Sequence, residues 1–259
     1  MDYYSLVPTY LNRLIAVDKL LRPGTVLLNV GCGKGGFNHL LRKRFKRVIG
    51  MDINAFDIAV AKSLTKDSHI QHYYMDAEKM EFPDASFDAI ICIDVLEHVK
   101  NKERVLREIN RVLKPKGQLI VSVPNKNYPW TFDPLNKLAD LIGIGHIPIG
   151  AYGCGHQELP TAEEIGNIVL KTRMQIRNTY FISHHLVGLL ELYHITLLQR
   201  FFKENASNDQ NSSKRSILRY DYNVPRHLQT IPKTIIALDE LLFSRSKKSI
   251  NIVFDIVKQ

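Results

Sequence analysis

Apolar residues in the first half of the chain alternate between short continuous runs and patterns with helical spacing. The runs predict strands near residues 26–30, 47–52, 69–74, 86–93 and 119–124. Helical patterns lie between them, and the last one puts four apolar residues on one face before a stop at residues 114–117, namely Val105, Ile109, Val112 and Leu113. Strands that alternate with helices predict an α/β fold with a mostly parallel sheet.

The second half continues this pattern after a long apolar insert at residues 126–160. Thr161 and Glu164 have the spacing of a capping box, which predicts that a helix begins there. A sixth strand is predicted near residues 174–182, a helix near 235–243 and a last strand near 249–257.

A glycine-rich turn follows the first predicted strand. Gly31, Gly33 and Gly36 fit the spacing G-x-G-x-x-G, and Asp52 follows at the ~20-residue offset expected for an acceptor of ribose hydroxyl groups. Glycines give such a turn unusual backbone angles and let a ligand approach closely. On spacing alone, the ligand is either a nicotinamide or flavin dinucleotide, or S-adenosylmethionine.

Further motifs favour the second ligand. Asp76 follows the third predicted strand, the sequence F-D-A-I-I at residues 87–91 runs into V-L-E-H-V at 95–99, and R-V-L-K-P-K-G occupies 111–117. With the glycine turn and Asp52, this ordered set resembles the class I S-adenosylmethionine-dependent methyltransferases, nearest the small-molecule and quinone-type members. The resemblance covers residues 25–125 well and the rest in outline.

The resemblance implies a Rossmann-like, doubly wound, mostly parallel seven-stranded sheet with an antiparallel last strand and a helical insert that covers the substrate. We expect one domain over residues 1–259. Its parts are an N-terminal helical segment at 1–24, a cofactor-binding half at 25–125, the substrate-covering insert at 126–160 and a C-terminal half at 161–259, with an apolar helix at 184–202 and a polar loop at 203–216.

The resemblance also implies which residues bind S-adenosyl-L-methionine. Asp52 would accept from the ribose hydroxyls and Asp76 from the adenine amino group, although each could instead serve only as a helix cap or a turn residue. Asn29 departs from the usual acid and lacks the charge that would attract the ammonium or sulfonium group of the ligand. The full expected set is Asn29, Gly31, Cys32, Gly33, Gly35, Asp52, Ile53, Asp76, Ala77 and Asp94.

Methyl transfer needs a positioned acceptor, and a base only if the acceptor loses a proton. The candidate bases are His156, His98 and Asp94, with His98 in the V-L-E-H-V segment where a helix is expected to begin. Glu97 and His98 are too few to indicate a metal site, so no metal is assigned.

The net charge of +9 suggests a search for nucleic-acid binding. The basic residues are spread over several predicted helix faces, so we expect no nucleic-acid partner. The N-terminus lacks a secretion signal pattern, which predicts a cytoplasmic protein. Glu191 and His194 interrupt the apolar segment 184–202, which argues against a membrane-spanning helix. The segment therefore predicts either a core helix or a peripheral membrane contact.

The expected function is methylation of a small, hydrophobic or lipid-like acceptor, with oxygen ahead of nitrogen or carbon as the acceptor atom. Two alternatives stay open. One is a non-catalytic protein that binds S-adenosylmethionine, which would tolerate Asn29, and the other is an NAD(P)-dependent oxidoreductase.

Overall fold

A computed structural model describes residues 7–146, 151–152, 159–191 and 230–259. The chain divides into two compact units. One comprises residues 16–123, 160–180 and 252–259, and the other comprises 1–15, 124–159 and 181–251. Helix α1 (Pro8–Leu20), which confirms the predicted N-terminal helix, has residues in both. The division into segments expected from the sequence remains a prediction.

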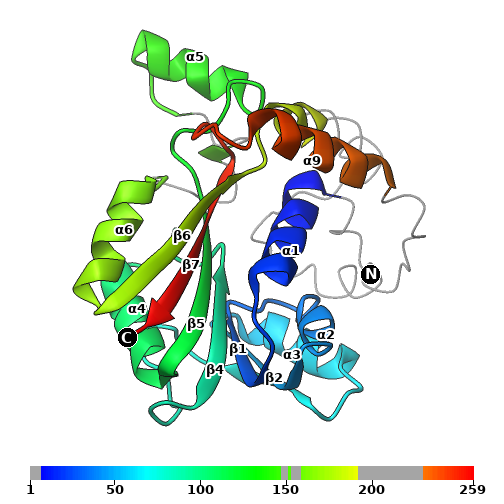
Figure 1. Cartoon of the computed structure of the whole chain (residues 1–259), viewed down its shortest axis with the longest axis vertical. Helices are drawn as coiled ribbons and strands as arrows, with labels where there is room; N and C mark the ends of the chain where they lie inside the picture. The colour runs from blue at the N-terminus through cyan, green and yellow to red at the C-terminus, as the bar shows by residue number, and fades with distance from the viewer. Residues whose placement is uncertain (1–6, 147–150, 153–158, 192–229) are drawn as a thin grey trace. The chain divides into compact units, whose positions relative to one another are not determined.

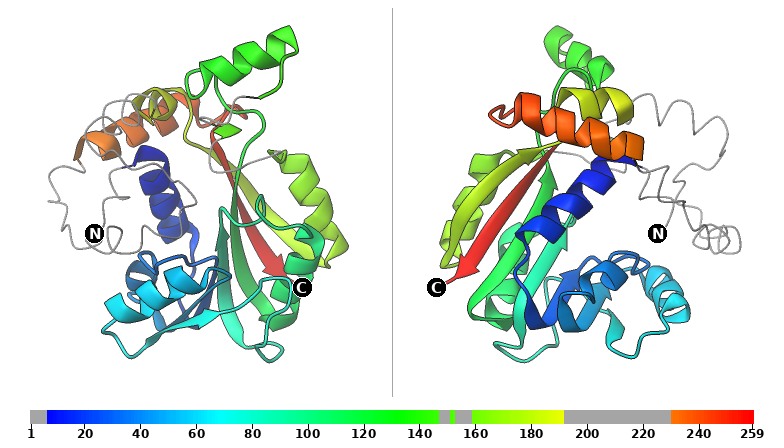
Figure 2. Two further views of the ribbon diagram at one scale, coloured as in Figure 1. Left: turned by 180° about the vertical axis from the view of Figure 1, so that it is seen from behind. Right: turned by 45° about the vertical axis from the view of Figure 1, so that its right-hand side comes forward.

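The first unit is built around a seven-stranded sheet with the order β3-β2-β1-β4-β5-β7-β6 (Figure 1). Strands β1 to β5 pair in parallel, and β7 runs between β5 and β6 in the opposite direction, as the two further views in Figure 2 also show. This confirms the Rossmann-like fold class. The strands are β1 (Gly24–Val30), β2 (Phe45–Asp52), β3 (Ile70–Tyr74), β4 (Phe87–Ile93), β5 (Leu113–Pro124), β6 (Met174–Ile182) and β7 (Asn251–Lys258).

Helices lie on both sides of this sheet, with α2 (Asn38–Leu41) and α3 (Ala55–Leu64) on one side and α4 (Lys102–Val112) and α6 (Ala162–Lys171) on the other (Figure 1). Helix α4 buries its apolar stripe completely. The predicted capping box of α6 is present, with the Thr161 hydroxyl accepting from the backbone of Glu164 and the Glu164 carboxylate accepting from the backbone of Thr161.

Two local predictions are wrong. Leu113 is the first residue of β5, not part of the face of α4, because it pairs with Phe87 of β4 before a bulge shifts the register. Residues 114–117, with Lys116 at φ +61, lie within β5 at this irregularity and do not precede the strand. The V-L-E-H-V segment also begins no helix: residues 96–98 form a turn, and α4 starts after Asn101, whose side chain caps it.

The second unit contains α5 (Pro134–Ile142), a helical turn at residues 185–191 and α9 (Thr230–Phe243). Asp239 of α9 is fully buried and accepts from the backbone N–H groups of three residues at the start of the helical turn. Those donors are His184, Leu186 and Val187. A carboxylate from a distant helix therefore fixes where the apolar segment at 184–202 begins.

This apolar segment is described only to Glu191, and the polar loop at 203–216 lies outside the described residues. Val187 is fully buried in a cluster with Leu11, Ile236 and Ile250, whereas Leu189 is 42% exposed. Within the described part of the chain, no helix is both long and apolar enough to span a membrane.

Helix α5 exposes the side that a soluble helix normally buries. Asn136 and Ala139 are buried, while four large apolar residues of the helix are exposed: Leu135, Leu138, Leu141 and Ile142. Asp133 explains the buried side, since it accepts from the backbone and the side chain of Asn136 and from the backbone of Ala151. The polar interactions inside this unit thus set the orientation of the helix.

Candidate functional site

Four parallel strands end at one edge of the sheet, and the residues expected to bind the cofactor follow these ends. Asn29 is the next-to-last residue of β1, Asp52 is the last residue of β2, and Asp94 comes directly after β4. In open α/β sheets, ligands bind outside the carboxyl ends of the strands. The topology therefore collects the predicted residues at the edge where a nucleotide-like ligand binds.

The glycine turn after β1 adopts backbone angles that favour glycine at three positions, Gly31 (φ +72), Gly33 (φ +50) and Gly35 (φ +78). Gly36 is not among them, so the conformation follows the set expected from the methyltransferase resemblance and not the dinucleotide spacing. A Cβ on Gly31 would lie 2.1 Å from a methyl group of Val95. Around Gly33, by contrast, no heavy atom of the described structure outside residues 32–34 lies within 4 Å of such a Cβ, which leaves room for a ligand to approach the backbone.

Hydrogen bonds attach this turn to the end of β2. The backbone N–H groups of Gly31 and Cys32 both donate to the carbonyl oxygen of Met51, at 2.8 and 2.9 Å. The N–H of Gly33 donates to Oδ2 of Asp52 at 2.8 Å. Asp52 is therefore not the cap of α3; that role belongs to Asn54, whose side chain accepts from the first turn of the helix. Each carboxylate oxygen of Asp52 can accept more than one hydrogen bond, so capacity remains for ribose hydroxyls.

Asp76 follows β3, next to the end of β2. The backbone N–H of Met75 donates to the carbonyl oxygen of Asp52, and one carboxylate oxygen of Asp76 accepts from the N–H of Glu78 at 2.8 Å. Asp76 thus is a turn residue, and its exposed carboxylate has acceptor capacity beyond that turn. Ile53, directly after Asp52, is 64% exposed and offers an apolar surface for a flat ring, while Ala77 is buried.

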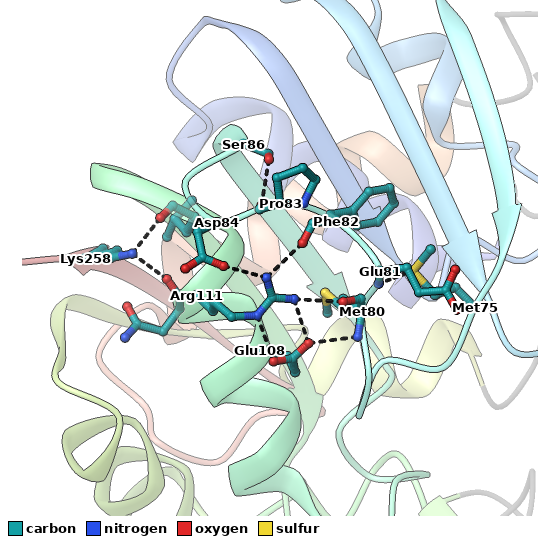
Figure 3. Close-up of polar contacts among 12 residues, drawn as sticks. Met75, Met80, Glu81, Phe82, Pro83, Asp84, Ser86, Glu108, Arg111 and Lys258 are labelled. Carbon is teal, nitrogen blue, oxygen red and sulfur yellow. Dashed lines mark hydrogen bonds and ion pairs between the residues drawn. The ribbon is translucent and has the colours of Figure 1, made fainter.

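Helix α4 holds the segment that follows Asp76 in place (Figure 3). The Arg111 guanidinium donates to the carbonyl oxygens of Met80 and Phe82 and to the carboxylates of Asp84 and Glu108, all between 2.7 and 3.0 Å. The carboxylates of Glu108 and Asp84 raise the pKa of Arg111 well above its usual value. Glu108 in turn accepts from the N–H of Met80, so one arginine and one glutamate fix the loop that carries Asp76.

The sequence pattern did not predict this role, because the basic residues of α4 were expected to lie on solvated helix faces. A signal was available in retrospect, since Glu108 and Arg111 are three residues apart and can pair along one helix face.

The structure describes two of the three candidate bases, Asp94 and His98. Asp94 has φ +53, its N–H donates to the carbonyl oxygen of Ser122, and the Ser122 hydroxyl donates to its carboxylate at 3.3 Å. His98 is exposed in a turn closed by its own N–H and the carbonyl oxygen of Val95. His156 lies outside the described residues, so the catalytic assignments remain predictions.

A buried polar chain lies beneath the glycine turn. Nδ2 of Asn29 donates to Oδ1 of Asn38 at 2.7 Å, and Nδ2 of Asn38 lies 3.0 Å from Nε2 of His72. All three residues are at most 4% exposed. Burial lowers the pKa of His72 to about 4, with smaller effects from His39 and Lys62, so the ring is neutral at physiological pH.

Cys32 is also buried in the glycine turn. Its burial, followed by the nearby charge of Asp52, raises the pKa of its thiol to about 12. The thiol is therefore protonated at neutral pH and is not a nucleophile. Its expected part in the site is limited to its backbone and its bulk.

Comparison with known proteins agrees with this geometry. The family described as "Methyltransferase domain" matches residues 28–121. A ubiquinone biosynthesis O-methyltransferase of Pseudomonas paraeruginosa is 34% identical over 40% of the chain and 46% of its own length. The ubiquinone/menaquinone biosynthesis C-methyltransferase UbiE of Vibrio vulnificus is 36% identical over 49% of the chain and 50% of its own length. The matches thus span about half the length of these curated relatives.

Among solved structures, the [4+2]-cyclase SpnF has a similar fold, with a TM-score of 0.61 and 17% identity over 95% of this chain and 79% of that protein. The fold and the strand-end site define a Rossmann-like nucleotide-binding protein. Over residues 28–121, which match the methyltransferase-domain family, the chain is similar to the class I S-adenosylmethionine-dependent methyltransferases.

Proposed function

We propose that this protein transfers a methyl group from S-adenosylmethionine to a small, hydrophobic acceptor. The observation that carries the proposal is the hydrogen bond from Gly33 to Asp52, which joins an open glycine turn to a carboxylate at the neighbouring strand end. Such a pair can hold the ribose of a nucleoside while the backbone of the turn lies against the rest of the ligand. We therefore propose the full predicted set of cofactor residues for this role.

The residues present fit this cofactor. Gly33 provides the backbone approach, Asp52 the acceptor for two hydroxyls, and Asp76 with Ile53 an acceptor and an apolar surface for the adenine. When bound, S-adenosylmethionine supplies an electrophilic methyl group, so the remaining task of the protein is to position the acceptor and exclude water. Asp94, held by Ser122, is the described residue that we propose as a base for an acceptor that loses a proton.

Two observations support a hydrophobic acceptor. The insert exposes a run of large apolar residues on α5, and Trp130 ahead of this helix is 52% exposed. The two relatives are named for O- and C-methylation in ubiquinone biosynthesis. We propose a quinone-like phenolic acceptor methylated on oxygen.

Transfer of tritium from methyl-labelled S-adenosylmethionine tests the activity. The panel consists of polyprenylated phenols, short-chain phenols and a control with no acceptor. Label in the organic phase with a phenol, and none with its O-methylated counterpart, supports the proposal. Binding of the cofactor with no transfer to any acceptor would favour the non-catalytic alternative.

We also propose peripheral contact with anionic membranes through the second unit. Helix α9 exposes Leu241 and Leu242, and Arg245, Lys247 and Lys248 follow it, so apolar and basic groups lie close together in sequence. Flotation with anionic liposomes should weaken as salt rises. Leu241→Glu, at a residue 76% exposed, should keep the fold and lose flotation. Absence of flotation of the parent protein at any salt concentration would leave only a soluble acceptor.

A further inference from the structure

The buried chain Asn29–Asn38–His72 has a direction, because each amide has a donor end and an acceptor end. His72 is neutral, and its Nε2 faces an NH₂ group, so Nε2 is the acceptor and the ring proton is on Nδ1. Asn38 then turns its carbonyl oxygen toward Asn29. Asn29 consequently turns its NH₂ group toward Asn38, and its carbonyl oxygen lies on the opposite side of the amide.

Two glycines next to these hydrogen-bonded side chains leave the space that the side chains occupy. A Cβ on Gly35 would lie 2.6 Å from Nε2 of His72, and a Cβ on Gly50 would lie 2.6 Å from Nδ2 of Asn38. Both glycines therefore leave space for the polar side chains. The backbone N–H of Asn38 also donates to the carbonyl oxygen of Gly35, which attaches the middle member of the chain to the glycine turn.

The opposite direction of these hydrogen bonds would also pair every donor with an acceptor. With the ring proton on Nε2 of His72, Asn38 would present its carbonyl oxygen to the ring and its NH₂ group to Asn29. Asn29 would then accept with its carbonyl oxygen and turn its NH₂ group the other way. A mixed arrangement would place two buried donors or two buried acceptors face to face, which is strongly unfavourable. The tautomer of His72 thus determines which end of the Asn29 amide is available.

We propose that Asn38 and His72 are positioning residues that orient the carbonyl oxygen of Asn29 to accept a hydrogen bond from the ammonium group of the cofactor's amino-acid moiety. This inference rests on the proposed function. With the ring proton of His72 on Nδ1, the oriented amide oxygen of Asn29 compensates in part for the carboxylate that Asn29 replaces. With the proton on Nε2, the NH₂ group of Asn29 would face the ammonium group and weaken binding of the cofactor.

Two ligands separate this role from a general structural one. S-adenosylhomocysteine carries the amino-acid moiety, whereas 5′-methylthioadenosine has the same adenine, ribose and thioether sulfur but no ammonium group. Asn38→Leu should weaken the binding of S-adenosylhomocysteine about ten-fold or more, which is the scale of a hydrogen bond to a charged group. It should weaken the binding of 5′-methylthioadenosine less than about two-fold. An equal loss for both ligands, or no loss, would overturn the proposal.

Variants of His72 give an independent test by rescue. His72→Leu removes the acceptor and should show the selective loss, whereas His72→Gln supplies an amide oxygen near the position of Nε2 and should restore most of the affinity. His69→Leu, at an exposed residue of the same segment, is the matched control and should leave both affinities unchanged. Loss in His72→Gln equal to that in His72→Leu would contradict the proposal.

Nitrogen NMR of the histidine rings tests the direction itself and does not depend on any ligand. We expect the Nδ1–H tautomer for His72 in the parent protein, assigned by its absence from His72→Gln. Asn38→Asp should retain the affinity and move the proton to Nε2, because a carboxylate accepts from both neighbours. If Asn38→Leu does not fold, Asn38→Asp carries the test. An Nε2–H tautomer in the parent protein would overturn the inference. Failure of the parent protein to bind either ligand would instead overturn the proposed function and, with it, the positioning role of Asn38 and His72.

Discussion

The N–H of Gly33 and Oδ2 of Asp52 are 2.8 Å apart, although 19 positions separate the two residues in the sequence. This bond fixes the open glycine turn to the end of β2. Since the same carboxylate also accepts from the N–H of Asn54, hydrogen bonds within the protein fix its orientation. Binding in such a site should be sensitive to small changes in the turn.

The glycines of the turn should separate stability from binding. Gly31→Ala places a methyl group against Val95 at a positive φ, so it should destabilise the fold by about 2–5 kcal/mol. Gly33→Ala meets open space and carries only the backbone cost, about 1–2 kcal/mol. Urea unfolding and calorimetry with S-adenosylhomocysteine measure both effects. We expect the folded Gly33→Ala protein to bind poorly; parent-like affinity would remove the turn from the site.

Arg111 should be necessary for the loop at residues 76–84. Arg111→Met leaves two part-buried carbonyl groups and the Glu108 carboxylate without a charged donor, which should cost about 2–4 kcal/mol in the free energy of unfolding. Arg107→Met is the matched control in α4, since its ion pair with Glu103 is largely exposed and should contribute about 1 kcal/mol or less. Faster hydrogen exchange over residues 76–84 in Arg111→Met alone would locate the effect. Equal costs for the two variants would show that Arg111 does not hold the loop.

His72 should make stability depend on pH. Its pKa in the folded protein is lowered to about 4 from an ordinary value of 6.5, so below pH 6.5 the unfolded chain binds a proton that the folded protein does not. The contribution of His72 to the free energy of unfolding therefore has its full value above pH 6.5. It decreases as the pH falls toward 4, by about 3 kcal/mol at most. The slope of the unfolding free energy between these values should be smaller in His72→Gln by about 1 kcal/mol per pH unit. Parallel pH profiles would show that His72 titrates normally.

Asn29→Asp tests whether charge limits cofactor attraction. A carboxylate near a sulfonium cation discriminates it from a neutral thioether by Coulomb attraction. The variant should therefore increase the affinity for S-adenosylmethionine more than the affinity for S-adenosylhomocysteine, as measured by calorimetry with both ligands. Equal changes for the two ligands would limit the role of residue 29 to the amino-acid moiety that they share.

The sequence predicted the fold and the strand-end residues well because these depend on local patterns. Continuous apolar runs located strands such as β4, predicted at residues 86–93 and observed at 87–93, and parallel pairing then placed Asn29, Asp52 and Asp94 at one edge without further information. The glycine turn was also readable, although only the structure distinguishes Gly35 from Gly36 by backbone angle.

Interactions between distant segments could not be read in the same way. His72 lies 34 positions from Asn38, and Arg111 lies 31 positions from Met80, so no local period links them. A polar residue in a short strand and a charged pair on one helix face were visible, but their partners depend on packing. The orientation of α5 has the same origin, since the buried contacts of Asp133 override its apolar pattern.

Calorimetric titration of S-adenosylhomocysteine into the parent protein and Asp52→Ala, with NAD titrated in parallel, measures whether the strand-end site binds the methyl-donor cofactor. We expect binding of S-adenosylhomocysteine to the parent, none of NAD, and a loss of about 1.5–3 kcal/mol in Asp52→Ala, because Asp52 accepts from the ribose hydroxyls as a charged group. Glu81→Ala, at an exposed acid, should bind as the parent does. Binding of NAD in place of S-adenosylhomocysteine, or unchanged affinity in a folded Asp52→Ala protein, would contradict this expectation.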